Sequence, residues 1–367
     1  MKSPVLKSLP VVMNHYVNES GWRMTLSPAC FEEQCRVLAE NGFRGLSLEE
    51  AEDYLLHGQS LPEKSLLFTF DDGFADNYFF ALPALAAHGH QAVCFPVADR
   101  IEDQEKPRAP LDALLDGRAE IPPLARNALT RTAQNFVVRR DLFLNRGEIA
   151  AMEKSGVFRI AAHGMGHYGV FSGPDFKDFF RPKDQYRTFY RTAMTPLWGL
   201  PDFPVKPGLK ALAFIPDPDL VEAVKKLVPQ DFNQAAAFFA EAANVNELRA
   251  LADRFKARLG RFETPCERRD RLWREIGEGK ALLEQILGRK VQSLCWPWGR
   301  YCSEAFNMAR DAGFKVFFTV RGGANPPGRP LAVRRFESSV QSGAAMAAQT
   351  RLHTRPLIAN LLGLVGK

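Results

Sequence analysis

Two pairs of side chains in this sequence have the types and the spacing to act together at one metal ion. The first pair, Asp71 and Asp72, ends an apolar run and precedes Gly73. Successive strand residues face opposite sides, but a glycine lets the backbone turn sharply, so both carboxylates can reach one cleft. One carboxylate could then bind a metal while the other moves a proton. The same three residues are also typical of a turn with a helix cap.

The second pair, His163 and His167, also follows a strand-like run. Gly164 and Gly166 let the backbone turn between the two imidazoles, so that both can meet one ion. Neutral imidazole is a common ligand of zinc, copper, iron and nickel. Two histidines and one carboxylate leave a coordination position open for water, as in a catalytic metal site. Two histidines at this spacing also occur by accident.

Two further segments end apolar runs in the same way. Trp296 and Trp298 lie in a Trp-Pro-Trp-Gly stretch that continues through Gly299 to Tyr301. Such a rigid aromatic platform could stack on the apolar face of a sugar, and backbone N–H groups of the turn could hold an oxyanion. A packed Trp-Pro turn is the alternative. His15 ends the first run and would point to the same place, unless it is a hydrogen-bonded core imidazole.

The elements that must position these residues alternate between strands and helices. Seven apolar runs are expected to form strands: residues 9–17, 65–71, 91–98, 157–163, 291–297, 314–320 and 331–337. Amphipathic stretches between them are expected to form helices: residues 28–41, 77–88, 146–155, 268–287 and 303–312. This alternation predicts a mostly parallel sheet with helices outside, and seven strands suit a distorted (β/α) barrel. In such a barrel, reactive side chains gather at the C-terminal ends of the strands.

One region breaks the alternation. Residues 171–267 are first rich in Phe, Pro, Tyr and Arg and then become helical and Ala-rich. A bare loop of that length is improbable inside a compact domain, so we expect a subdomain. The predicted fold is therefore α/β, a distorted seven-stranded (β/α) barrel with a helical, aromatic-rich insertion. Its parts are the barrel at 1–170 and 268–340, the insertion at 171–267 and a C-terminal helical tail at 341–367.

The composition is that of a globular protein with a sizeable core, because 46% of the 367 residues are hydrophobic and 25% are charged. Lys and Arg number 48 against 42 Asp and Glu, and this net charge of +6 is too mild to indicate a nucleic-acid partner. No secretory signal, spanning segment or CxxC pair is found, which predicts a cytoplasmic protein with reduced thiols. The apolar stretch 357–365 predicts a terminal helix packed on the core, with peripheral membrane contact as the alternative.

Taken in this order, the segments resemble the motifs of the polysaccharide deacetylase family, the NodB-homology carbohydrate esterases of family four. Residues 69–73 match its first motif letter for letter. His163 and His167 match its metal-binding pair, and residues 296–299 resemble its third motif. The resemblance covers about residues 9–170 and 268–340.

The resemblance implies a divalent metal, commonly zinc, with Asp72, His163 and His167 as its ligands. It implies that Asp71 is the general base and that His15 is the candidate for the catalytic acid, which other members carry near the C-terminus. His353 is the alternative acid.

Many family members carry an arginine before the Pro of the third motif to orient the base. Here Cys295 and Trp296 occupy that stretch. Arg334 or Arg335, on the last predicted strand, is the candidate to orient the base in its place.

The function that the resemblance implies is a metal-dependent hydrolase that removes an N-acetyl group from an amino sugar and releases acetate. An acetylated carbohydrate would then be the partner, as a polysaccharide or as a lipid-linked or nucleotide-linked precursor. An O-acetyl esterase, a hydrolase of non-sugar amides and a silent carbohydrate-binding homologue are the alternatives.

Overall fold

The computed structural model describes residues 5–20, 24–124, 129–131, 136–182, 197–337 and 342–365. Residues 183–196 of the predicted insertion and residues 341, 366 and 367 of the predicted tail lie outside this part of the chain.

A six-stranded parallel sheet forms the centre of the molecule. Its strand order is β16-β1-β5-β6-β9, and β4 pairs with the beginning of β5. The longest strand, β5, is buried along its whole length except at Asp72. A continuous apolar run of this kind is typical of a parallel strand that is covered on both faces. The strands of this sheet are β1 (Val11–Asn14), β4 (Arg44–Gly45), β5 (Ser65–Asp72), β6 (Ala92–Pro96), β9 (Phe158–Ile160) and β16 (Phe336–Glu337).

The α/β architecture with a parallel central sheet confirms the predicted class, but the ladders do not close into the predicted seven-stranded barrel. Among the described residues, the six-stranded sheet ends at β9 on one side and at β16 on the other. Strands β14 (Ser293–Cys295) and β15 (Val316–Phe318) form a separate parallel pair. Only single bridges connect this pair to its surroundings, from Ala162 to Leu294 and from Phe318 to Val333.

Helices follow most strands, and local sequence sets their ends. Asn145 and Glu148 form a capping box at the start of α5, and Gly156 ends this helix in the left-handed conformation. The helices are α1 (Pro28–Glu40), α2 (Leu48–His57), α3 (Leu82–Ala87), α4 (Leu111–Leu115), α5 (Arg146–Ser155), α6 (Pro218–Leu227), α7 (Phe232–Ala240), α8 (Ala242–Arg254), α9 (Pro265–Trp273), α10 (Gly279–Leu287), α11 (Ser303–Asp311), α12 (Gly343–His353) and α13 (Pro356–Val365).

The remaining strands form four short pairs outside the central sheet. The pair β2–β3 is parallel, and the pairs β7–β8, β10–β11 and β12–β13 are antiparallel. Their bounds are β2 (Tyr16–Val17), β3 (Thr25–Leu26), β7 (Leu129–Arg131), β8 (Phe136–Val138), β10 (Gly169–Phe171), β11 (Val205–Pro207), β12 (Phe214–Pro216) and β13 (Gly260–Phe262).

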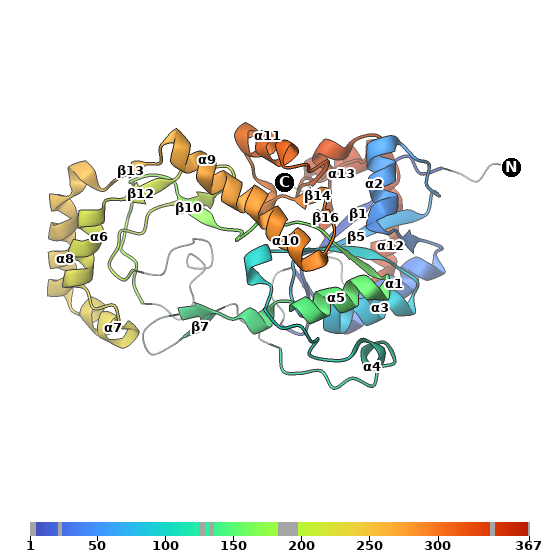
Figure 1. The fold of residues 1–367 in the computed structure, drawn as a ribbon, viewed down its shortest axis with the longest axis horizontal. Coiled ribbons are helices and arrows are strands. Elements are labelled where there is room, and N and C mark those ends of the chain that lie inside the picture. The colour runs from blue at the N-terminus through green and yellow to red at the C-terminus, as the bar shows by residue number, and fades with distance from the viewer. Residues whose placement is uncertain are drawn as a thin grey trace.

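The described side chains form two large hydrophobic cores. The first core holds the central strands together with helices such as α1, α2 and α10. The second core lies between residues 171 and 252 and is built around Trp198, Leu220 and Leu248. Figure 1 shows α6, α7 and α8 gathered at one end of the molecule, away from β1 and β5, with α9 and α10 leading back toward the strands.

The C-terminal helix α13 packs through one face and exposes the other. Ala359 is fully buried, and Gly363 approaches Gly322 so closely that an added Cβ would lie 2.5 Å from its backbone. Leu357 and Leu361 are 81% and 63% exposed on the opposite side. Within the described part of the chain, no helix combines the length and the apolar character that crossing a membrane requires.

Candidate active site

The candidate residues gather where the parallel strands end. Asp71 and Asp72 end β5, His15 follows β1, His163 follows β9, and Cys295 ends β14. Because parallel strands in one sheet present their carboxyl ends at the same edge, residues that lie far apart in the sequence meet there.

Asp72, His163 and His167 form a compact cluster of metal-ligand type. The Asp72 Oδ1 atom lies 3.5 Å from His163 Nε2 and 3.7 Å from His167 Nε2. One ligand atom of each side chain lies within 4.8 Å of the others. Burial lowers the pKa of His167 to about 3, so this imidazole is neutral and its lone pair is free to bind a cation.

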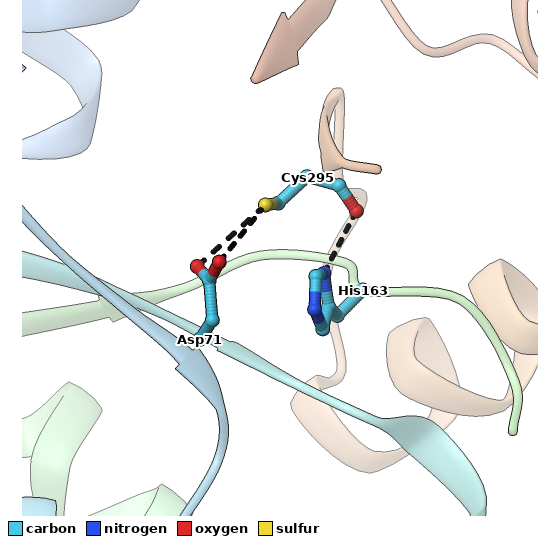
Figure 2. Close-up of side chains that lie close together, drawn as sticks. All are labelled: Asp71, His163 and Cys295. Carbon is cyan, nitrogen blue, oxygen red and sulfur yellow. Dashed lines mark hydrogen bonds between the residues drawn. The ribbon is translucent and has the colours of Figure 1, made fainter. Parts of the chain in front are cut away.

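A hydrogen bond from the ring nitrogen that faces away from Asp72 orients His163. Its Nδ1 atom lies 2.8 Å from the carbonyl oxygen of Cys295, as Figure 2 shows. A carbonyl only accepts, so Nδ1 carries a proton, and Nε2 is the ring atom that faces Asp72. Asp72 Oδ1 itself is buried without a hydrogen-bond partner among the described atoms. A buried carboxylate oxygen without a donor, facing two imidazole nitrogens, fits a bound cation.

The backbone is strained at the same place. Only four described residues other than glycine have a positive φ, and three of them belong to this site: Asp72 at 70°, His167 at 56° and Trp298 at 52°. Such left-handed conformations cost free energy in residues with a Cβ, and the surrounding structure must enforce them. They cluster at functional sites in proteins, which agrees with the chemical character of these three side chains.

Asp71 is held by a buried arginine. The Arg335 guanidinium donates to both carboxylate oxygens of Asp71, each over 2.7 Å, and donates further to the carbonyl of Thr319 and to Thr69 Oγ1. Burial alone would raise the pKa of the Asp71 carboxyl, but the ion pair with Arg335 outweighs it and holds the pKa at about 2. Asp71 is therefore ionised at neutral pH.

Two other groups lie against Asp71. The thiol of Cys295 is 3.6 Å from both carboxylate oxygens (Figure 2), and it also accepts from Arg335 Nη2 over 3.0 Å. The His15 Nε2 atom is 3.9 Å from Asp71 Oδ2. The His15 ring is nearly buried, and its Nδ1 atom has no hydrogen-bond partner among the described residues.

The loop from His163 to His167 is clamped by two other segments. Glu275, in a single π-helical turn between α9 and α10, accepts from the backbone N–H of Gly166 through its carboxylate and from that of Met165 through its carbonyl. Arg100 donates to the carbonyl of Gly166 over 2.9 Å. These bonds fix the loop that carries His163 and His167.

The other predicted residues divide into those that reach the site and those that do not. The Trp298 ring lies edge-on to His167, with 4.4 Å between ring centroids. Trp296 is fully buried and stacks on Tyr301 and Phe317, so it packs in the core and not on a ligand. Tyr301 is half-buried, and its ring packs against that of Trp296.

The turn at Gly299 differs from expectation, and the structure distinguishes between the two candidate arginines. The N–H of Gly299 donates to the carbonyl of Trp296 over 2.7 Å, so it is not available to an oxyanion. Of the two candidate arginines, Arg335 contacts Asp71, whereas Arg334 donates to Asn360 of α13.

Two neighbours of the site were not predicted. Glu275 lies in a charged helical stretch whose sequence gives no signal of a contact with Gly166. Cys295 was noted only as occupying the place of an arginine, although a cysteine that ends a buried strand beside reactive residues is a signal of proximity. Both act on the candidate ligands and base through hydrogen bonds and contacts.

Comparison with known proteins gives matches to one family. Residues 58–178 match the family model of the polysaccharide deacetylases. YxkH of Bacillus subtilis, whose name places it among the polysaccharide deacetylases, is 36% identical over 93 residues, or 25% of this chain and 33% of the relative. The poly-β-1,6-N-acetyl-D-glucosamine N-deacetylase of Escherichia coli is 26% identical over 148 residues, or 40% of this chain and 19% of the relative. The chain thus spans a third or less of these curated relatives.

Solved structures share the fold over most of the chain. A de-N-acetylase from Aggregatibacter actinomycetemcomitans superposes with a TM-score of 0.56 at 20% identity, over 89% of this chain and 94% of that one. The deacetylase domain of BpsB from Bordetella bronchiseptica superposes with a TM-score of 0.55 at 19% identity, over 90% and 95%. At these identities the likeness shows the fold.

The segment that matches the family model carries Asp72, His163 and His167 of the cluster, together with Asp71. Residues 58–178 are thus similar to the polysaccharide deacetylases, the family whose motifs the sequence resembles.

Proposed function

We propose that this chain is a metal-dependent hydrolase that removes the N-acetyl group from an amino sugar and releases acetate. The observation that carries the proposal is the convergence of Asp72, His163 and His167, with the ionised carboxylate of Asp71 next to them. The N-deacetylase activity in the name of the Escherichia coli relative supports an N-acetylated sugar as the substrate class.

Asp72, His163 and His167 would hold a divalent metal, for which zinc is the first expectation because its sites combine imidazole and carboxylate ligands. When bound, such a metal supplies a Lewis acid for the acetyl carbonyl and for the attacking water. The chain itself supplies the ligand geometry, since the Cys295 carbonyl fixes the proton of His163 on Nδ1.

Proton transfer is assigned to the other two groups. Asp71 takes a proton from the attacking water, and Arg335 holds its carboxylate in place with two charge-assisted hydrogen bonds. His15 gives a proton to the leaving amine, so that the C–N bond breaks to acetate and a free amino sugar. Trp298 forms a wall of the site beside His167.

Purified protein tests this function with acetylated sugars and metal analysis. Asp71→Asn is expected to keep its metal and to lose about 10²–10⁴-fold in kcat, because the base is removed. Asp72→Ala and His163→Ala are expected to lose the metal. Asp116→Asn, on the surface beside Arg118, is the matched control. Full acetate release after removal of all divalent metal would contradict the proposal, and turnover of acetyl esters alone would make the chain an esterase.

We also propose how the chain is organised around the site. The single bridges at Ala162–Leu294 and Phe318–Val333 support a distorted barrel in which β14 and β15 complete a ring of seven with β1, β5, β6, β9 and β16. The second hydrophobic core supports a separate unit at 171–267, with the barrel at 1–170 and 268–340 and a helical tail at 341–367.

A further inference from the structure

A cavity of about 380 Å³ is lined by three cationic side chains. Lys206, Lys210 and Arg300 form its charged wall, together with Ser172 and the apolar Leu212. No carboxylate is among the lining residues. Three positive charges on one cavity repel one another, and an anion in the cavity would relieve that repulsion.

The neighbouring arginines have carboxylate partners, and these three cations do not. Arg261 pairs with Glu267, Arg268 with Glu304 and Arg271 with Glu263. Within the described ranges, the charged ends of Lys206, Lys210 and Arg300 make no ion pair or hydrogen bond. Their charges are therefore available to a ligand.

Two chain connections tie this cavity to the catalytic cluster. Lys206 of β11 pairs with Val170 of β10, which begins two residues after His167. Arg300 lies two residues after Trp298, whose ring is 4.4 Å from that of His167. Lys206 thus lies on the strand that pairs with the one after His167, and Arg300 follows the turn that carries Trp298.

Hydrogen bonds hold the backbone segments of the cavity wall together. The N–H of Cys302 donates to the carbonyl of Leu209 over 2.9 Å, which joins the two segments that carry the cations. Arg271 donates to the carbonyls of Gly208 and Ala211, on both sides of Lys210, and Glu263 balances its charge. The backbone that carries the three cations is thus held before a ligand binds, and only their side chains become ordered on binding.

We propose that this cavity binds an anionic substituent of the substrate, a phosphate or a carboxylate, while the neighbouring acetylated sugar occupies the catalytic cluster. The substrate class is then an acidic N-acetylated glycan. This inference rests on the proposed deacetylase function.

Kinetics on three matched probes test it: an N-acetylglucosamine pentasaccharide, the same oligomer carrying a 6-phosphate and the same oligomer oxidised to a 6-carboxylate. We expect at least about tenfold higher kcat/KM on an anionic probe than on the neutral one at low salt, falling as salt screens the charges. In the triple variant Lys206→Gln, Lys210→Gln, Arg300→Gln, the ratio between anionic and neutral probes is expected to approach one. The probe with the larger ratio identifies phosphate or carboxylate as the group.

The control is a triple variant with the same loss of charge elsewhere on the surface: Lys154→Gln, Lys226→Gln, Arg310→Gln. It should keep the wild-type ratio, and an equal fall of the ratio in both variants would overturn the proposal, since net charge alone would explain it. A wild-type ratio near one would also overturn it.

A binding measurement separates this inference from the proposed function. Calorimetry compares N-acetylglucosamine 6-phosphate and 6-carboxylate (N-acetylglucosaminuronate) with N-acetylglucosamine, using Asp71→Asn so that turnover is removed. Tighter binding of an anionic sugar that is lost in the triple variant supports the cavity even if no probe is deacetylated. Hydrolysis of the neutral probe without any preference for anionic sugars in either assay leaves the deacetylase and rejects the cavity.

Discussion

Asp71 and Asp72 are neighbours in the chain but contact different groups. Asp71 still belongs to the β5–β6 ladder, opposite Phe95, and its side chain meets Arg335. Asp72 adopts a φ of 70°, and its side chain meets His163 and His167. One carboxylate is therefore bound by a permanent cation, while the other has an oxygen without a hydrogen-bond donor. This difference underlies the separate roles that we propose for them.

The bidentate bond from Arg335 is expected to matter for the position of Asp71. In Arg335→Lys the cation remains, but a lysine cannot present the planar fork that donates to both oxygens. We expect kcat to fall about 10–100-fold, the equivalent of roughly 1.5–3 kcal/mol for a hydrogen bond to a charged group, with little change in KM or metal content. Steady-state kinetics and metal analysis of the purified variant check this.

Arg334→Lys is the matched control, because Arg334 lies next in the chain and donates to Asn360 instead. Its kcat should stay close to that of the wild type. A similar fall in both variants, or full activity of Arg335→Lys, would contradict the role of Arg335.

The sequence could name the reactive residues but not always the side chain that faces them. Arg334 and Arg335 are adjacent, and successive residues of an extended segment point to opposite sides. Which side faces Asp71 depends on the register of β16 against β1, a long-range feature. Trp296 and Trp298, two residues apart, would share a side in an extended segment, but Trp298 has a φ of 52° in a turn, so Trp296 lies in the core and Trp298 lies beside His167. The sequence therefore predicted which residues lie at the strand ends, but not which of their side chains face the site.

At the scale of elements, the turn after β5 has little room. Gly73 has a φ of 73°, and a Cβ added to it would lie 2.6 Å from the Cβ of Pro96 in β6. Gly156 has a similar φ of 71°, but an added Cβ would meet nothing within 4 Å. We expect Gly156→Ala to cost about 1–2 kcal/mol of unfolding free energy from the backbone alone. Gly73→Ala should cost about 1–3 kcal/mol more, from overpacking.

Urea unfolding of the two variants measures this difference directly. Because both changes add one methyl at nearly the same φ, the difference between them isolates the close contact with Pro96. Equal urea midpoints for the two variants would show that Pro96 of β6 shifts to accommodate the added methyl group without loss of unfolding free energy.

Glu275 lies in the helical segment that follows the insertion, and it bonds the loop that carries His163 and His167. Its carboxylate accepts from Gly166 over 3.2 Å, and burial raises its pKa. Glu275→Ala leaves the Gly166 N–H without that acceptor, so the loop can relax. Loss of such a supporting contact is expected to weaken metal affinity about 10–100-fold. Competition with a chelating dye measures the affinity.

Glu278→Ala is the control for this experiment, because Glu278 lies on the same helical turn but is exposed. It should leave the metal affinity unchanged. An unaltered affinity in Glu275→Ala would mean that the bond from Arg100 to Gly166 and the backbone bond from Met165 to residue 275 hold the loop without the carboxylate.

Most strands and helices were predictable because their apolar period is local. The run 65–71 became β5, and the stretch 146–155 became α5 with the same bounds. The helix α2 was not predicted, although Ser47 and Glu50 form a capping box at its start. Closure of the sheet could not be judged from the sequence, because β14 and β9 are joined only by a single bridge that depends on tertiary packing.

At the scale of the molecule, two hydrophobic cores are joined by the helical segment that begins at α9. This segment starts with α9, which follows the part of the chain that forms the second core. It continues through the turn that carries Glu275 and ends in α10, which packs in the first core. Figure 1 shows α9 and α10 following one another between the two ends of the molecule. One continuous helical segment thus links the end of the insertion to the turn that bonds the histidine loop.

The stability of the whole molecule is expected to depend on His353 in acid. The imidazole is 4% exposed at the end of α12 and stacks on Phe336 of β16, with ring centroids 4.0 Å apart. Burial lowers its pKa to about 4 in the folded state, against about 6.5 in an unfolded chain. The folded state thus binds fewer protons than the unfolded chain between these pH values. The contribution of the neutral His353 to stability is therefore complete above pH 6.5 and is lost as the pH falls toward 4.

His353→Phe keeps an aromatic ring and removes the titration. The wild type should lose about 3 kcal/mol of unfolding free energy relative to this variant between pH 7.5 and pH 4. Urea unfolding at both pH values measures the difference, and a constant offset between the two proteins would show that His353 is not the group that titrates.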